Sequence, residues 1–332
     1  FARDIVYARQ KLPAPEVPKV EATLVKQVSS HIGVEEYVRV SVGNVRGKMV
    51  AAPLSRGAGL ISSLSKAQGY FTIEPADAGL SAGTVVPVTM LRKSRPENTI
   101  LAVGSHDLAV ELLGVFLRRR MEEVSLSSAN VGSMGGIMAI RNNEAHMAGI
   151  HMLDEQTGRY NVSFTQKYLA NCTWQLVHMA MRQQGFIVLP GNPKGIEGFA
   201  DLTKPDTTFV NRQRGSGTRM LLDYELRKAG INSSRIVGYE KEVGTHMAVA
   251  ATVKAGAADT GLGVQAAAVA LGLDFVPAAQ EQYDLLLNFD ADDPRLQVIL
   301  DILQSDEFRR EVEGLGGYDL SDAGKLVAVN YK

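Results

Sequence analysis

From residue 96 onward the sequence alternates between short runs typical of strands and longer segments with the apolar spacing of helices. Residues 99–103, 124–127 and 147–150 are runs of the first kind, and turns that carry glycine, hydroxyl or imidazole groups follow them. Strands that alternate with helices favour a doubly wound α/β architecture. Because ligands of open α/β sheets bind beyond the carboxyl ends of the strands, we expect these turns to line one cleft.

Residues 211–219 form the most distinctive of the turns. A short strand-like run precedes this stretch, and a segment with helical spacing follows it and stops at Gly230. Glycines let the backbone approach a ligand closely, and the free N–H groups of a helix start favour an anion. The stretch therefore predicts an anion site, and a plain helix cap beside solvated arginines is the alternative. It is not a Walker A loop, because that motif's spacing and lysine are missing.

Both halves of this region contribute candidate ligand-binding residues. They are Ser105, His106, Asp107, Ser133, Met134, Gly135, His151, Arg212, Arg214, Gly215, Ser216, Gly217, Thr218, Arg219, Thr245 and His246. We expect Arg219 or Arg214 to donate charge-assisted hydrogen bonds to an anion. An anionic Asp107 would repel a dianionic oxyanion unless an arginine lies between them. Either its side chain therefore turns away to cap a helix, or the ligand is not simple molybdate.

The sequence assigns no catalytic and no metal-binding residue. His106, His151 and His246 have side chains that suit a metal or an acid–base role, but they lack the local spacing of metal ligands. A set of nucleophile, base and orienting group is not visible in the sequence. The candidate residues therefore support binding of a small anionic ligand rather than catalysis.

Composition and charge exclude several classes of protein. With 332 residues and a formal net charge of −1, the chain gives no indication of direct nucleic-acid binding. Cys172 is the only cysteine, which excludes an internal disulfide framework and favours a reducing compartment. No apolar run is long enough to span a bilayer, so no membrane association is expected. Since the chain starts at Phe1 without a methionine or a signal peptide, we expect a cytoplasmic protein that lacks an upstream part.

Two regions precede the α/β pattern. Residues 1–22 contain Pro13, Pro15 and Pro18, which predict an extended linker or the end of a missing upstream domain. Residues 23–92 consist of short alternating runs with glycine at most turns, which predicts a small all-β barrel or sandwich. The expected fold is therefore multi-domain, with a small β-domain before an α/β region.

Residues 20–92 resemble the C-terminal β-barrel domain of the MoeA family of molybdopterin molybdenumtransferases. The resemblance is carried, in order and spacing, by residues 53–64, 67–73 and 79–88. In that family the barrel follows a catalytic domain that inserts the metal into the dithiolene cofactor. The resemblance implies that a MoeA-type catalytic domain lies upstream and is missing from this chain, so this part would not be catalytic by itself.

Residues 97–320 resemble the type 2 periplasmic-binding-protein fold, and in particular the binding-protein-like domain found fused to MoeA-type proteins. Residues 190–196, 211–219, 245–246 and 261–263 carry this resemblance as an ensemble. It implies two α/β lobes within residues 97–332: lobe 1 at about 97–184 and 275–332, and lobe 2 at about 185–274. We expect the hinge near 184–190 and 272–284, and no continuous sheet across both lobes.

The sequence is compatible with three functions. The α/β domain could be a sensor or delivery module that binds molybdate or tungstate for molybdenum-cofactor biosynthesis. Three arginines and a His-Asp loop would also suit a larger anionic ligand, such as a molybdopterin intermediate. The chain could also be the non-catalytic part of a molybdenumtransferase. No covalently bound cofactor is expected, and the ligand's identity, a homodimer and regulation of the attached domains by lobe closure stay open.

Overall fold

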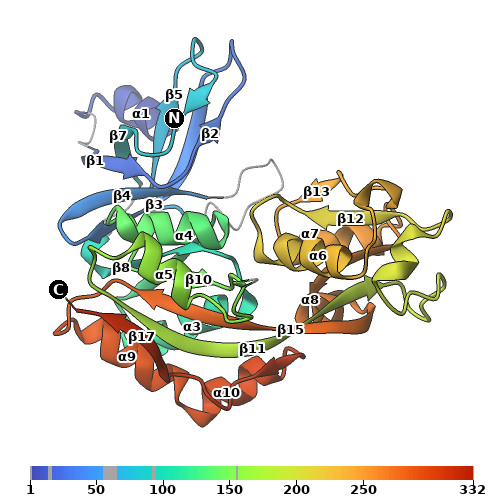
Figure 1. The fold of residues 1–332 in the computed structure, drawn as a ribbon. Coiled ribbons are helices and arrows are strands. Elements are labelled where there is room, and N and C mark those ends of the chain that lie inside the picture. The colour runs from blue at the N-terminus through green and yellow to red at the C-terminus, as the bar shows by residue number, and fades with distance from the viewer. Residues whose placement is uncertain (1, 14–16, 55–65, 92–94, 155, 332) are drawn as a thin grey trace. The chain divides into compact units, whose positions relative to one another are not determined.

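The computed structural model describes residues 2–13, 17–54, 66–91, 95–154 and 156–331 (Figure 1). The chain divides into two compact units, Phe1–Thr99 and Ile100–Lys332. Most of the 53–64 segment that contributes to the MoeA resemblance lies outside the described residues. No helix in the described part is long and apolar enough to cross a membrane.

The first unit is a closed β-barrel with the strand order β1-β4-β3-β5-β7. These strands are β1 (Lys19–Leu24), β3 (Glu36–Val45), β4 (Lys48–Pro53), β5 (Gly69–Ile73) and β7 (Val85–Met90), and β2 (Val28–Ser29) pairs separately with β6 (Gly79–Leu80). Buried side chains such as Val38, Val40 and Phe71 fill the barrel. The predicted small β-domain is confirmed as a barrel.

The expected linker over residues 1–22 is not extended throughout. Residues Ala2–Arg9 form helix α1, and Lys19 already pairs with Thr89 in the barrel. The prolines explain the difference, because they restrict only the segment from residue 13 to 18 and its immediate predecessors.

The second unit is built on a ten-stranded sheet whose path runs β13-β12-β14-β11-β15-β10-β8-β9, with β16 and β17 paired to β11. One group of elements comprises β8 (Thr99–Gly104), α3 (Leu108–Arg120), β9 (Ser125–Asn130), α4 (Gly132–Arg141), β10 (Met147–Ile150) and α5 (Val162–Tyr168). The other comprises β12 (Phe209–Arg212), α6 (Gly217–Lys228), β13 (Glu242–Val243), α7 (His246–Lys254), β14 (Thr260–Val264) and α8 (Gln265–Leu271). We call these groups lobe 1 and lobe 2. The expected α/β domain with two lobes is thus present.

Two long strands, β11 (Trp174–Val188) and β15 (Asp274–Leu287), run side by side between the lobes (Figure 1). They pair antiparallel along nearly their whole length, so the sheet continues from lobe to lobe. The expectation that no continuous sheet crosses both lobes is therefore wrong. The sequence also predicts a turn at residues 183–185. This prediction is wrong, because Gly185 lies within β11, where an added Cβ would lie 2.2 Å from the backbone oxygen of Val276. This glycine serves close strand packing rather than a turn.

The sequence predicts helices over residues 294–303 and 307–315 that close the outer face of lobe 1, and the C-terminal helices do cover this lobe. Helices α9 (Pro294–Leu303) and α10 (Asp306–Glu313) pack on α3, where the rings of Phe116 and Phe308 meet edge to face at 5.4 Å. The short strands β16 (Tyr318–Asp319) and β17 (Leu326–Asn330) then return to β11. These contacts fix lobe 1 against the strands that lead to lobe 2.

Lobe 2 differs from the sequence prediction at one strand. The sequence predicts a strand over residues 235–238. Instead, Ser233–Arg235 form a short 3-10 helix, η3, and β13 pairs with β12. Gly238 has a φ of +93°, a left-handed conformation incompatible with a continuing strand. The sequence also predicts a turn followed by a short helix within residues 191–202, and a second 3-10 helix, η2 (Phe199–Thr203), forms at the end of this range.

Candidate functional site

Four helices, α3, α4, α6 and α7, begin at the predicted ligand-binding turns, and each except α4 is capped by a side chain from its turn. Asp107 accepts a hydrogen bond from the N–H of Ala109 at the start of α3 (2.7 Å). Ser216 caps α6 through the N–H of Arg219 (3.2 Å), and Thr245 caps α7 in the same way. Because the first N–H groups of a helix have no acceptor within the helix, Gly217 presents such a donor at the start of α6.

The start of α6 in lobe 2 lies directly against lobe 1. A Cβ added to Gly217 would lie 2.4 Å from His151 Nδ1 and 2.6 Å from its backbone oxygen. Nearby, the side-chain amide of Asn130, at the end of β9, donates to the backbone oxygen of Gly244 (2.7 Å). The lobes therefore meet at the predicted turns, and only a residue without a side chain fits at position 217.

A buried charge cluster lies on β11 and β15 beside this contact. Arg182 of β11 is 1% exposed and forms ion pairs with Asp107 and with Glu281 of β15. The hydroxyl of Tyr318 donates to Asp107 (2.9 Å), and Arg182 stacks on the ring of Tyr283 at 4.1 Å. Asp107 thus turns away as a helix cap with a cationic partner, which is the arrangement that the sequence required for an anion site.

Glu281 also ends a buried relay of three side chains. His151 Nδ1 lies 2.8 Å from Glu281 Oε2, and His151 Nε2 lies 2.8 Å from Ser105 Oγ. Burial alone would raise the pKa of Glu281, but the charge of Arg182 lowers this pKa to about 2. Burial lowers the pKa of His151, and Arg182 and Arg212 lower it further against the opposing effect of Glu281. The relay at neutral pH therefore consists of a hydroxyl, a neutral imidazole and a carboxylate.

The most distinctive feature of the site is a buried guanidinium group with free donors. Arg212, at the end of β12, is 4% exposed, and its Nη2 donates to the backbone oxygen of Gly244 (3.1 Å). Its Nε and Nη1 have no hydrogen-bond partner among the described residues. Burial, reinforced by the charge of Arg182, lowers the pKa of Arg212 to about 10, so the group stays protonated at neutral pH. It is a buried cation in need of an acceptor.

His246, at the start of α7, adds a second group of this kind. Its side chain is 6% exposed, and neither ring nitrogen has a partner in the described part of the chain. Burial lowers the pKa of His246 well below its usual value, and the charge of Arg212 adds to this effect. The imidazole is therefore neutral, with one nitrogen available as a donor and the other as an acceptor.

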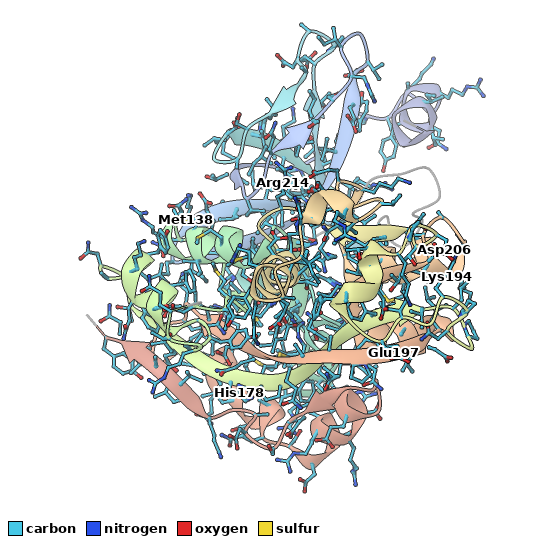
Figure 2. All side chains as sticks on the ribbon, turned by 45° about the vertical axis from the view of Figure 1, so that its right-hand side comes forward. Met138, His178, Lys194, Glu197, Asp206 and Arg214 are labelled. Carbon is cyan, nitrogen blue, oxygen red and sulfur yellow. The ribbon has the colours of Figure 1, made fainter. Side chains whose placement is uncertain are left out.

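The other two arginines of the predicted stretch are occupied by carboxylates. Arg219 pairs with Asp223 (3.2 Å) and Glu242 (3.3 Å) and stacks on the ring of Tyr239 at 4.0 Å. Arg214, labelled in Figure 2, is exposed and pairs with Glu240 at 2.9 Å. Their guanidinium groups are thus engaged within lobe 2, in contrast to the expectation that one of them donates to an anion.

The remaining predicted residues surround these groups in different ways. Buried Ser133 accepts from the backbone N–H of His151 (3.1 Å), and buried Thr218 accepts from Gln184 (3.1 Å). His106, half-buried, lies 3.6 Å from Glu111. Met134, Gly135 and Thr245 are half-buried, and Gly215 is exposed with a left-handed φ of +82°. Among the described residues there is no group of three histidine, cysteine or acidic side chains that could hold a metal ion.

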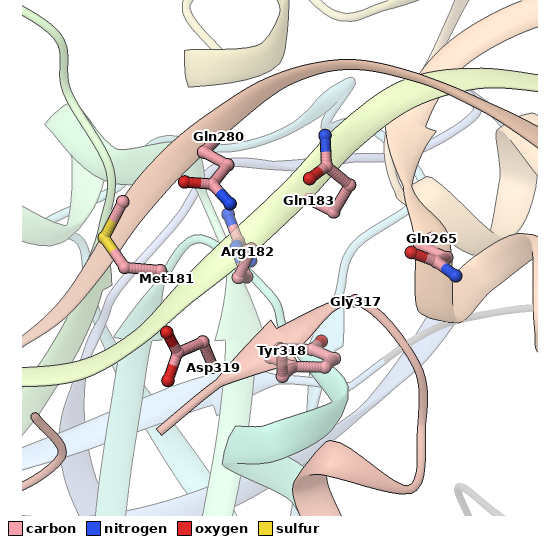
Figure 3. A pocket seen from close by; sticks show the side chains of 8 residues that line it. All are labelled: Met181, Arg182, Gln183, Gln265, Gln280, Gly317, Tyr318 and Asp319. Atoms are coloured by element: carbon pink, nitrogen blue, oxygen red, sulfur yellow. The ribbon is translucent and has the colours of Figure 1, made fainter. Parts of the chain in front are cut away.

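A pocket of about 200 Å³ lies along β11 and shares Arg182 and Tyr318 with the buried charge cluster (Figure 3). Its lining residues are Met181, Arg182, Gln183, Gln265, Gln280, Gly317, Tyr318 and Asp319. None of them belongs to the predicted ligand-binding set. We place the candidate site at Arg212 and His246 instead. Their buried nitrogen atoms have no hydrogen-bond partner among the described residues, and a bound ligand would supply one.

The sequence analysis missed the members of this site that lie on β11 and β15. Glu281 is absent from the predicted set, although its carboxylate accepts a hydrogen bond from His151, which lies 130 positions away in the chain. It also contacts Arg182 and Gln184 of β11, which are absent from the set as well. With Glu281 in place, the structure contains the order of hydroxyl, imidazole and carboxylate that the sequence analysis did not find.

Two lobes joined by long paired strands, with polar groups at their contact, define the fold class of this unit. The PBP superfamily domain matches residues 115–304, more than half of the chain, so the chain belongs to that superfamily. The MoeA C-terminal region (domain IV) matches residues 21–91, which agrees with the resemblance and with the barrel.

Two curated proteins are similar to this chain. The uncharacterized protein YvgK of Bacillus subtilis is 32% identical over 225 residues, which span 68% of this chain and 72% of YvgK. A protein encoded in the 5′ region of the ferredoxin 2Fe-2S gene of Clostridium pasteurianum is 42% identical over 110 residues, 32% of this chain and 97% of that protein.

Among solved structures, the fold is similar to that of a substrate-binding protein assigned to a phosphate ABC transporter of Clostridium perfringens, which holds phosphate. The TM-score is 0.50 at 15% identity, and the match covers 66% of this chain and 98% of the other. At this identity the similarity concerns the fold alone.

Proposed function

We propose that the PBP superfamily domain binds a small oxyanion where its lobes meet. The observation that carries this proposal is Arg212, a protonated and buried guanidinium group with two unpaired donor atoms among the described residues. An anion would supply the missing acceptors through charge-assisted hydrogen bonds. The start of α6 supports the same location, because its free N–H groups and helix dipole favour negative charge.

The ligand we favour is molybdate or tungstate, bound for sensing or delivery in molybdenum-cofactor biosynthesis. The barrel supports this role, since it matches the MoeA C-terminal region. The solved neighbour from Clostridium perfringens holds phosphate, another tetrahedral oxyanion. A larger molybdopterin intermediate is the alternative ligand, and we propose the cytoplasm as the compartment.

Calorimetric titration of the chain with molybdate, tungstate, sulfate and phosphate tests the proposal. We expect at least one of these anions to bind and an Arg212→Met variant to lose most of that affinity. If none of the four anions binds the unmodified chain, the small-oxyanion proposal fails and the molybdopterin intermediate becomes the next ligand to test.

The relay of Ser105, His151 and Glu281 favours a second candidate function, hydrolysis of a small ester. Ser105 Oγ would attack the ester carbonyl carbon while His151 Nε2 takes the hydroxyl proton and then gives it to the departing alkoxide. Water would next attack the acyl group, release the acid and restore the serine hydroxyl. Fluorophosphonate labelling followed by intact-mass measurement tests this candidate.

In that experiment the label should attach to the unmodified chain and to Ser133→Ala but not to Ser105→Ala. Ser133 is a suitable control because it is buried and accepts from the backbone of His151 rather than from its ring. An unlabelled chain would rule out a nucleophilic Ser105.

A further inference from the structure

We propose that the site takes up one proton at His151 when it binds a fully deprotonated oxyanion. This inference rests on the proposed anion binding and adds how protons regulate it. It follows from the relay's hydrogen-bond directions and from the charges around the His151 ring.

The carboxylate of Glu281 fixes the directions of the hydrogen bonds in the relay. An ionised carboxylate only accepts, so His151 Nδ1 donates to Glu281 Oε2 (2.8 Å). In a neutral imidazole Nε2 is then an acceptor, and Ser105 must donate its hydroxyl hydrogen to it (2.8 Å). Ser105 Oγ therefore offers other groups only lone pairs.

Molybdate, tungstate and sulfate carry oxygens that only accept when they are fully deprotonated. Such an anion meets lone pairs at Ser105 as long as His151 is neutral. When His151 gains a proton at Nε2, that N–H donates to Ser105 Oγ, and the serine hydroxyl hydrogen becomes free to donate to the anion. One proton thus converts Ser105 from an acceptor into a donor.

The proposed anion position lies close to His151. Gly217, at the start of α6, packs so tightly against the imidazole that an added Cβ would lie 2.4 Å from Nδ1. An anion held by the free N–H groups of this helix start is therefore near both the ring and Ser105.

Charged and titratable groups from four elements face His151. They are Glu281 and Tyr283 of β15, Arg182 of β11, Arg212 of β12 and His246 of α7. Burial and the two arginines keep the imidazole neutral without an anion, against the effect of Glu281. A bound dianion adds negative charge on the Arg212 side and so raises the pKa of His151. The imidazolium form is then favoured in the complex.

Molybdate titrations at one pH in buffers of different ionisation enthalpy measure the uptake directly. At a pH between the His151 pKa of the free chain and that of the complex, we expect uptake of about one proton per bound molybdate. In this range the molybdate affinity should fall about tenfold per pH unit. Nuclear magnetic resonance of the unmodified chain should also show a higher His151 pKa in the presence of molybdate. Molybdate binding without proton uptake, or with an unchanged His151 pKa, would overturn the inference and leave the proposed function standing.

Two matched variants assign the proton to its residue. His151→Gln should still bind molybdate, more weakly, but without proton uptake. His246→Gln makes the same change at the other buried histidine and should retain the uptake. Proton uptake that persists in His151→Gln and disappears in His246→Gln would place the proton on His246 and overturn this inference. A chain that binds no molybdate would overturn the molybdate proposal and this inference together.

Discussion

Replacing Arg212 by methionine should stabilise the protein and weaken its ligand binding at once. Burial lowers the pKa of Arg212 to about 10, whereas an arginine ordinarily titrates above about 12. At about 1.4 kcal/mol per pKa unit, keeping this group charged costs about 3 kcal/mol relative to water. Methionine is similarly long and flexible, so it can fill the space without the charge.

The variant loses one hydrogen bond, worth about 1 kcal/mol, from Arg212 Nη2 to the backbone oxygen of Gly244. That oxygen keeps its bond from Asn130 (2.7 Å). The net gain in the free energy of unfolding should therefore be about 2 kcal/mol, which a thermal melt would show as a rise of several degrees. Anion affinity should fall about 10- to 100-fold, because a charge-assisted hydrogen bond is worth about 1.5–3 kcal/mol.

Arg219→Met is the matched control, because Arg219 belongs to the same stretch but pairs with Asp223 and Glu242. We expect this variant to lose stability and to bind anions nearly as well as the unmodified chain. The proposed role of Arg212 is refuted if Arg212→Met melts at a lower temperature with unchanged affinity, or if Arg219→Met has the larger effect on binding.

Three further predictions concern the lobe contact and the buried charges. Gly217→Ala should weaken anion binding at least about tenfold in calorimetry, because its Cβ would meet His151 at 2.4 Å and hold the lobes apart. Asp107→Asn keeps the helix cap but leaves Arg182 with one carboxylate fewer, so thermal melts should show a loss of about 3–5 kcal/mol. The pKa of Glu281 is lowered to about 2 in the folded state. The ionised carboxylate therefore stabilises the fold fully above the pKa of Glu281 in the unfolded chain, and this stabilisation is lost as the pH falls towards 2. Urea unfolding should show this loss as about 3 kcal/mol, and a Glu281→Gln variant should lack it.

Features that depend on neighbouring residues could be predicted from the sequence. The helix that begins at His246 and the caps at Ser216 and Asp107 follow from local hydrogen bonding between a side chain and nearby N–H groups. The closed barrel also follows the local alternation of its strands. These elements are therefore found largely where the sequence places them.

The choice among the arginines depended on partners elsewhere in the chain. Arg219 pairs with Glu242, which lies in β13. No strand was predicted at these residues. A signal for Arg212 was present, because it lies two positions after Val210, and alternate residues of a strand share a face. Val210 packs in the same core as Val249 of α7, so that face points towards the helix that carries His246.

The relay depends on strand register, which no local pattern in this sequence determines. Arg182 lies opposite Glu281 in the pairing of β11 with β15, and this pairing brings the carboxylate to Arg182. A shift of one residue would turn Glu281 to the other face of the sheet, away from His151. The ladder contains irregularities between His178 and Ala180 and between Gln184 and Gly185, so counting from either end of β11 gives the wrong partner. The pairing of β11 with β15 therefore has two effects. It makes the sheet continuous across the lobes, contrary to the prediction, and it brings together the buried charges of the site.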